Sequence, residues 1–234
     1  MLTAALVCIP ASPNIDVITS EAPFITFGCS MKLSVELTKP VELSVGGMSG
    51  HIFRRSIHVG MILLPWIYFE HGEMISDKLG LTLPQFVSTM VFILFILEAL
   101  RLQFGITIFG QREYEANQIS ALGWGAFGIG IVFVMAPIEA YAWPIILSLS
   151  LGDPFLGEMR RRGMSTRDVV LSSTALLIAV WLACWHFFGT PWWMAFFFAP
   201  LCVASEWPRL RYIDDNATMV LIPLAALMIL LPLV

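Results

Sequence analysis

A carboxylate, two glycines and three consecutive arginines occur together between Gly152 and Arg162. Asp153 provides an oxygen ligand of the kind that Mg²⁺ prefers, and Arg160, Arg161 and Arg162 carry guanidinium groups suited to phosphate oxygens. This segment follows a hydrophobic stretch in a chain that is mostly apolar. The combination predicts a site where a metal-bound polyphosphate meets a membrane, as in an enzyme that transfers phosphate to a lipid.

Four further polar clusters stand at the ends of apolar segments. They are Arg54, Arg55 and His58; Glu98 and Arg101; the polar loop 110–118; and Glu206 with Asp214, Asp215 and Asn216. Residues three or four apart share a helix face, which applies to Arg54 with His58 and to Glu98 with Arg101. Charged groups at the hydrocarbon boundary are costly unless they are paired or functional. Together these clusters predict one site.

Each cluster also has a purely structural interpretation. Arg54 and Arg55 would anchor the topology, the three consecutive arginines would bind anionic lipid headgroups, and Glu98 would form an ion pair with Arg101. His58 would be a buried, hydrogen-bonded histidine. Asp214 to Asn216 would cap the last helix, although a cap needs only one such residue.

Composition predicts an all-α integral membrane bundle. Of 234 residues, 58% are hydrophobic and only 13% are charged, whereas soluble domains carry about 25% charged residues. The four cysteines form no C-x-x-C pair, and His51, His71 and His186 lack partners at ligand spacing, so a zinc site is not expected. We expect no nucleic-acid partner.

Apolar segments predict about seven transmembrane helices, although several are shorter than the ~20 residues of a perpendicular span. They cover roughly 53–69, 82–100, 118–136, 138–152, 168–188, 191–206 and 217–234. With a cytosolic N-terminus, ten arginines fall in inner positions, and Lys78 is the only basic residue of the outer loops. This positive-inside pattern predicts a multi-pass protein, N-in and C-out, with its polar clusters on the cytosolic face.

Residues 1–50 are expected to form a separate cytosolic arm, with 51–234 as the transmembrane domain. Between residues 25 and 45 the pattern partly alternates, and Lys39-Pro40 interrupts it. Alternation of this kind predicts a short hairpin or an extended arm. The arm contributes no predicted chemistry.

Several motifs resemble the polyprenol kinase family, which includes dolichol kinase and phytol kinase. Arg54-Arg55-Ser56-Ile57-His58 resembles its R-[RK]-x-x-H opening, and Glu98-Ala99-Leu100-Arg101 resembles its E-x-x-R element. Gly152-Asp153-Pro154 resembles its G-D-x segment, and Asp214-Asp215-Asn216-Ala217-Thr218 its closing D-D-N-x-T. The order and rough spacing agree over residues 52–234. The family's later K-[ST]-x-E-G element is absent, and arginines stand in the same region.

The resemblance implies an integral membrane kinase that transfers the terminal phosphate of a nucleotide, typically CTP, to a long-chain isoprenoid alcohol. Mg²⁺ would be held by Asp153 with Asp214 or Asp215, and the hydroxyl proton would pass to Asp215, Glu98 or His58. Nucleotide and phosphate contacts would come from Arg54, Arg55, Arg101, Gly152, Glu158, Arg160, Arg161, Arg162, Glu206 and Asn216. The choice between CTP and ATP, the identity of the alcohol and the oligomeric state stay open.

Two other functions are alternatives, of which a cytidylyltransferase is the close rival. A cytidylyltransferase would use the same metal and arginines to attach CMP to a lipid phosphate. A transporter or lipid-binding protein would line a path with polar groups at mid-bilayer, and the predicted spans are almost free of them. The glycines of 118–136 would allow close packing of another helix or of an isoprenoid chain, with helix packing the expected role.

Overall fold

The computed structural model describes residues 44–136, 138–208, 210 and 213–233. The regular elements within these ranges are helices, joined by turns and loops. The only β pairing among them is an isolated antiparallel bridge between Ser44 and Arg112, so the all-α prediction is confirmed for this part of the chain. The hairpin expected between residues 25 and 45 lies outside the described residues, apart from the last two. The elements are α1 (Gly47–Gly60), α2 (Leu63–Lys78), α3 (Leu83–Gln103), the 3₁₀ helix η1 (Glu113–Asn117), α4 (Ala121–Met135), α5 (Glu139–Arg161), α6 (Thr166–Phe188), α7 (Met194–Ala204), α8 (Asp215–Leu230) and the 3₁₀ helix η2 (Leu231–Leu233).

Helices α3 and α6 are long and apolar enough to cross a membrane. α3 has 21 residues with a mean hydropathy of 1.9, and at 1.5 Å per residue it spans about 31 Å, close to the thickness of a bilayer's hydrocarbon core. Only Val87 and Arg101 of α3 are buried, and Phe92 is 65% exposed. α3 therefore presents an apolar surface that the other helices leave uncovered.

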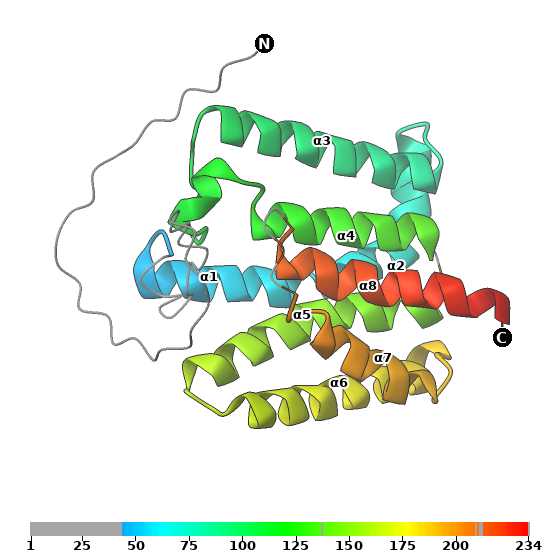
Figure 1. Ribbon diagram of the computed structural model, residues 1–234. Helices are drawn as coiled ribbons and strands as arrows, with labels where there is room; N and C mark the ends of the chain where they lie inside the picture. Colours follow the sequence, from blue (N-terminus) through cyan, green and yellow to red (C-terminus); the bar gives the residue numbers. More distant parts are fainter. Residues whose placement is uncertain (1–43, 137, 209, 211–212, 234) are drawn as a thin grey trace, which may run out of the picture. The chain divides into compact units, whose positions relative to one another are not determined.

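Helix α5 is the central element of the bundle, in contact with α1, α2, α4, α6, α7 and α8 (Figure 1). Its side chains Ile145, Ile146 and Leu149 are fully buried. Trp181 of α6 stacks on Phe198 of α7, and its Nε1 donates a hydrogen bond of 2.9 Å to Ser148 Oγ on α5. The helix that carries Asp153 is thus fixed on most sides.

The glycines of α4 serve helix packing. A Cβ on Gly128 would lie 3.2 Å from Val220 of α8, and one on Gly130 would overlap Val91 of α3. Bare glycine faces allow two helices to approach closely. The expected helix-packing role of these glycines is therefore confirmed.

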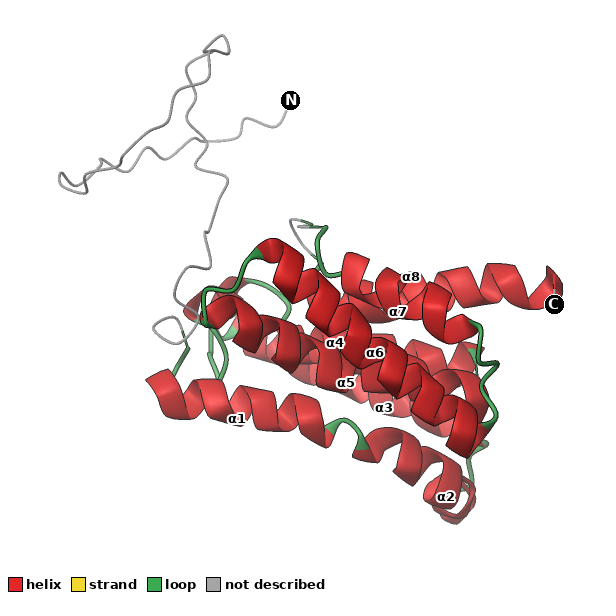
Figure 2. Cartoon of the chain, turned by 90° about the horizontal axis from the view of Figure 1, so that it is seen from below, coloured by secondary structure: helices red, strands yellow, loops and turns green. Residues whose placement is uncertain are grey.

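The first predicted span, residues 53–69, is wrong as a single helix. Figure 2 shows two successive helices, α1 and α2, separated by a short turn at Met61 and Ile62. Pro65 explains the break, because proline lacks the N–H that would bond the Met61 carbonyl and its ring crowds that carbonyl. In the first turn of α2 the same proline is tolerated.

Two other boundaries also differ from the prediction. The span predicted to end at residue 152 continues as α5 to Arg161, so Gly152-Asp153-Pro154 lies inside a helix. Arginines in the last turn stabilise that continuation through the helix dipole and through pairs with Glu158, and Gly163, at φ +72°, ends it. The predicted span 191–206 contains only the 11-residue α7.

The polar clusters gather at one end of the helices. Figure 1 shows that α4, α6 and α8 begin at the end of the bundle where α3 and α5 finish. Asp153 lies eight residues before the end of α5, which places it about 12 Å inside that end.

Candidate metal and phosphate site

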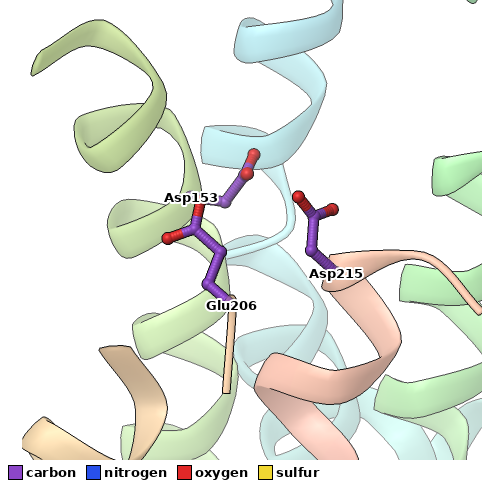
Figure 3. Close-up of side chains that lie close together, drawn as sticks. All are labelled: Asp153, Glu206 and Asp215. Atoms are coloured by element: carbon purple, nitrogen blue, oxygen red, sulfur yellow. The ribbon is translucent and has the colours of Figure 1, made fainter. Parts of the chain in front are cut away.

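Three carboxylates from distant parts of the sequence converge at this end. Asp153 lies on α5, Glu206 follows α7 by two residues, and Asp215 is the first residue of α8. One carboxylate oxygen of each lies within 4.8 Å of the others, and Figure 3 shows the three side chains directed toward a common space. Convergent carboxylate oxygens are the ligand type that hard divalent cations take in proteins.

Glu206 is the most buried member of the acidic cluster. Glu206 is 6% exposed, and its Oε2 has no hydrogen-bond partner among the described residues. Its other oxygen accepts a 2.8 Å bond from Arg160. Burial raises the pKa of Glu206 to about 8, and the carboxylates of Asp153 and Asp215 act in the same direction, against Arg160. An unpartnered buried carboxylate oxygen is costly, and a bound cation removes that cost.

The start of α8 fixes Asp215. Asp214 Oδ1 accepts a 3.1 Å hydrogen bond from the Asn216 backbone N–H, which is the capping arrangement expected at a helix start. Asn216 Nδ2 donates to the Ala121 carbonyl, 3.1 Å away, and ties α8 to the start of α4. The other amide atom, Asn216 Oδ1, is buried without a hydrogen-bond partner among the described residues.

This arrangement changes the expected ligand set. Asp214, predicted as a possible metal ligand, acts as the helix cap, and Glu206, predicted as a phosphate contact, joins Asp153 and Asp215 instead. Burial, followed by repulsion from Asp215, raises the pKa of Asp214 well above the usual range. Because Asp214 Oδ1 caps α8 and the carboxylate oxygens that converge are those of Asp153, Glu206 and Asp215, we assign the candidate site to these three acids.

His58 approaches the acidic cluster from α1. It is 2% exposed, and its Nδ1 lies 3.3 Å from Asp153 Oδ2. No hydrogen bond to Nδ1 is formed among the described residues, so the contact with Asp153 is electrostatic. His58 therefore lies beside the acidic cluster, and its role as a proton acceptor stays a prediction.

Arg54 has a partner that the sequence analysis did not assign. Its Nη1 lies 2.6 Å from Oε1 of Glu115 in η1, and Glu115 is only 2% exposed. The same carboxylate accepts bonds from the backbone N–H groups of Arg112 and Ala121, each at 3.2 Å. The three-residue spacing of Arg112 and Glu115 is typical of a side chain that bonds back to the backbone at a helix start, and it was the signal in the sequence for these contacts of Glu115. Arg54 is thus paired with a buried carboxylate.

Arg112 is a second residue that the prediction missed. Its Nη1 donates a 2.5 Å hydrogen bond to the Tyr114 hydroxyl, and its charge interacts with Asp214 and Asp215. It thus supplies positive charge to the carboxylate side of the site. Its place in the polar loop 110–118 gave no specific indication of this.

Arg101 is a structural residue, which corrects its predicted phosphate role. All five of its N–H groups are bonded: two to Glu98, and the others to the carbonyls of Ile106, Glu115 and Gln118. A guanidinium has only five donors, so none is left for a phosphate. Glu98 orients Arg101 as predicted and also accepts a bond from Ser120 N–H, which leaves it unsuited to act as a base.

Four arginines, Arg55 of α1 and the three after Asp153, pair with two acids, Glu158 and Glu206. Arg55, Arg161 and Arg162 all contact Glu158, at 2.6–2.9 Å, so Glu158 holds arginines instead of binding phosphate itself, a correction to its predicted role. Arg160 contacts Glu206 and stacks over Trp207, with 4.7 Å from its Cζ to the ring centroid. Three guanidinium groups around one carboxylate leave an excess of positive charge beside the acidic cluster.

Gly152 has a packing role. A Cβ there would lie 3.3 Å from Met219 and 3.4 Å from Leu177. Inside a helix its N–H is bonded within the helix, so the predicted contact with phosphate is wrong.

Comparison of the chain with protein-family models, with curated proteins and with solved structures gave no match. The resemblance to polyprenol kinases therefore rests on the quoted motifs.

Proposed function

We propose that this protein is an integral membrane kinase whose active site lies on the cytosolic face of the bilayer. The enzyme would transfer the terminal phosphate of a nucleotide, with CTP as the first candidate, to the hydroxyl of a long-chain isoprenoid alcohol. The observation that carries the proposal is the convergence of Asp153, Glu206 and Asp215, with an arginine-rich rim, at one end of a helical bundle. The apolar helices α3 and α6 support the membrane location. The resemblance to polyprenol kinases supplies the substrate classes.

The reaction would form a bond between the alcohol oxygen and the γ-phosphorus and break the bond from that phosphorus to the β–γ bridging oxygen. The hydroxyl proton is released, and the nucleoside diphosphate leaves. Phosphoryl transfer depends mainly on positioning and charge neutralisation. Bound Mg²⁺ would supply the neutralisation of phosphate charge.

The residues have separate roles in this scheme. Asp153, Glu206 and Asp215 would hold the Mg²⁺, and Arg160, Arg161 and Arg162 would contact phosphate oxygens from the end of α5. His58, beside Asp153, is the group best placed to receive the hydroxyl proton. Glu98 and Arg101 would support the scaffold of the site.

The test uses purified full-length protein in vesicles with Mg²⁺, γ-labelled CTP or ATP, and farnesol, geranylgeraniol, phytol or dolichol. Labelled lipid phosphate with release of CDP is expected, whereas CMP and pyrophosphate would indicate a cytidylyltransferase. Asp153→Asn should reduce turnover at least 100-fold, with Asp77→Asn, an exposed aspartate of α2, as the matched control. Full activity of folded Asp153→Asn would refute the metal assignment.

A further inference from the structure

A small pocket opens beside the acidic cluster, between α1, the loop 106–111 and the start of α4. Its volume is about 70 Å³, several times the ~10–15 Å³ that one water molecule needs. Its apolar lining consists of Phe53, Ile57, Ile108, Phe109 and Leu122. Gly110, at φ +87°, lets the loop approach α1 closely, since a Cβ there would lie 3.0 Å from the Gly50 carbonyl oxygen. The pocket is too small for a nucleotide.

The pocket and the acidic cluster share His58 as a common wall. His58 lines the pocket, and its Nδ1 faces Asp153 at 3.3 Å. This Nδ1 has no hydrogen bond among the described residues, so a ligand hydroxyl that reaches the Asp153 side of the ring can pair with it. A hydroxyl placed at this wall would be next to the proposed metal site.

The charges of the pocket cancel. Arg54 and Glu115 both line it, and they form an ion pair of 2.6 Å with each other. The other polar side chains of the lining are His58 and Gln111, and Gln111 Oε1 accepts a bond from Ile108 N–H. The positive and negative charges of this lining are therefore balanced, which favours a neutral hydroxyl over an anionic headgroup.

The outer rim of the pocket is apolar and exposed. Phe53, Ile108, Phe109 and Leu122 are each between 43% and 53% exposed, and Ile52 beside them is 57% exposed. Adjacent exposed apolar side chains mark a surface that binds an apolar partner. A hydrocarbon chain could therefore leave the pocket without crossing a polar surface.

We propose that this pocket holds the hydroxyl-bearing end of a single-chain lipid alcohol, with the hydroxyl at His58 and the chain passing over Phe53, Ile108 and Phe109. The inference rests on the proposed kinase function and adds the position of the acceptor. It also implies selection of the alcohol over its own phosphate, because the lining is charge-neutral.

A photolabelling experiment tests the pocket without turnover. Full-length protein in lipid nanodiscs, free of nucleotide, is irradiated with a geranylgeraniol analogue that carries a diazirine in its first isoprene unit. Label is expected on peptides that contain Phe53, Phe109 or Leu122. Unlabelled geranylgeraniol should compete at least tenfold better than geranylgeranyl monophosphate.

Two variants make the test specific. Leu122→Trp should fill the pocket and lower the labelling at least fivefold, whereas Leu97→Trp, at an exposed position of α3 outside the pocket, should leave it unchanged. Label confined to other peptides, or equal competition by the monophosphate, would overturn the proposal. Labelling without turnover would refute the kinase function alone, and turnover without pocket labelling would refute the pocket alone.

Discussion

Replacing Arg101 distinguishes a structural residue from a phosphate ligand. Arg101→Ala would leave the Glu98 carboxylate without its bidentate partner and three backbone carbonyls, those of Ile106, Glu115 and Gln118, without their donors. The side chains of Arg101 and Glu98 are only 5% and 13% exposed. Removing one member of a buried ion pair costs about 3–5 kcal/mol.

This cost should be visible as a lower melting temperature. For a domain of this size about 1 kcal/mol corresponds to roughly 2–4 °C, so a decrease on the order of 10 °C is expected. Cys184 and Cys202 are free and buried, and a thiol-reactive fluorescent dye would report their exposure on heating. Cys8 and Cys29 would first be replaced by Ser so that the signal comes from the bundle.

Two variants complete the measurement. Arg101→Lys keeps the charge but has at most three donors, so it should melt between the wild type and Arg101→Ala. Arg162→Ala, whose side chain is 69% exposed, should melt close to the wild type. If Arg101→Ala melts like the wild type, the structural assignment is incorrect and a role in phosphate binding becomes tenable again.

Three further perturbations test the site and its scaffold. Mg²⁺ should raise the melting temperature of the wild type but not of Glu206→Gln, because a ligand stabilises only the state that binds it; an equal rise in both would contradict the assignment. Without metal, stability should fall as the pH rises from about 5 to 8, because folded Glu206, with a pKa of about 8, keeps a proton that the unfolded chain has released. Tryptophan fluorescence during thermal unfolding would measure that slope, which should be smaller in Glu206→Gln. Gly128→Ala should destabilise the α4–α8 contact by about 1–3 kcal/mol, because the added Cβ would lie 3.2 Å from Val220. Gly60→Ala is the control, since Gly60 has open space around it and the change should not affect packing. Equal melting temperatures of the two variants would exclude this packing role of Gly128.

The sequence predicted helices well where hydrophobic runs have clear ends. The predicted spans at 82–100, 118–136 and 168–188 correspond closely to α3, α4 and α6. Hydropathy alone did not separate α1 from α2, because the break depends on the backbone geometry at Pro65. Hydropathy also predicts an end of α5 at residue 152, because the polar residues that follow lower the hydropathy although the helix continues to Arg161.

For the candidate site, too, the sequence predicted one part and left another open. Residue types and spacing identified the acids and arginines, and the structure brings Asp153 and Asp215 together. Spacing could not show that Arg101 uses its remaining three donors on the carbonyls of Ile106, Glu115 and Gln118, because the chain folds back on α3 through the loop that ends at Gln118. Nor could it separate Glu206 from Asp214 as a ligand, which depends on where the segment between α7 and α8 enters the bundle.

Pro154 gives the central helix a specific mechanical property. A helix bends most easily where proline removes a backbone bond. α5 has two internal prolines, Pro144 and Pro154, and Pro154 directly follows Asp153. A bend at Pro154 would change the direction of the arginine-bearing turn relative to the part of α5 that is buried in the bundle. Asp153 lies at the boundary between these two parts of the helix.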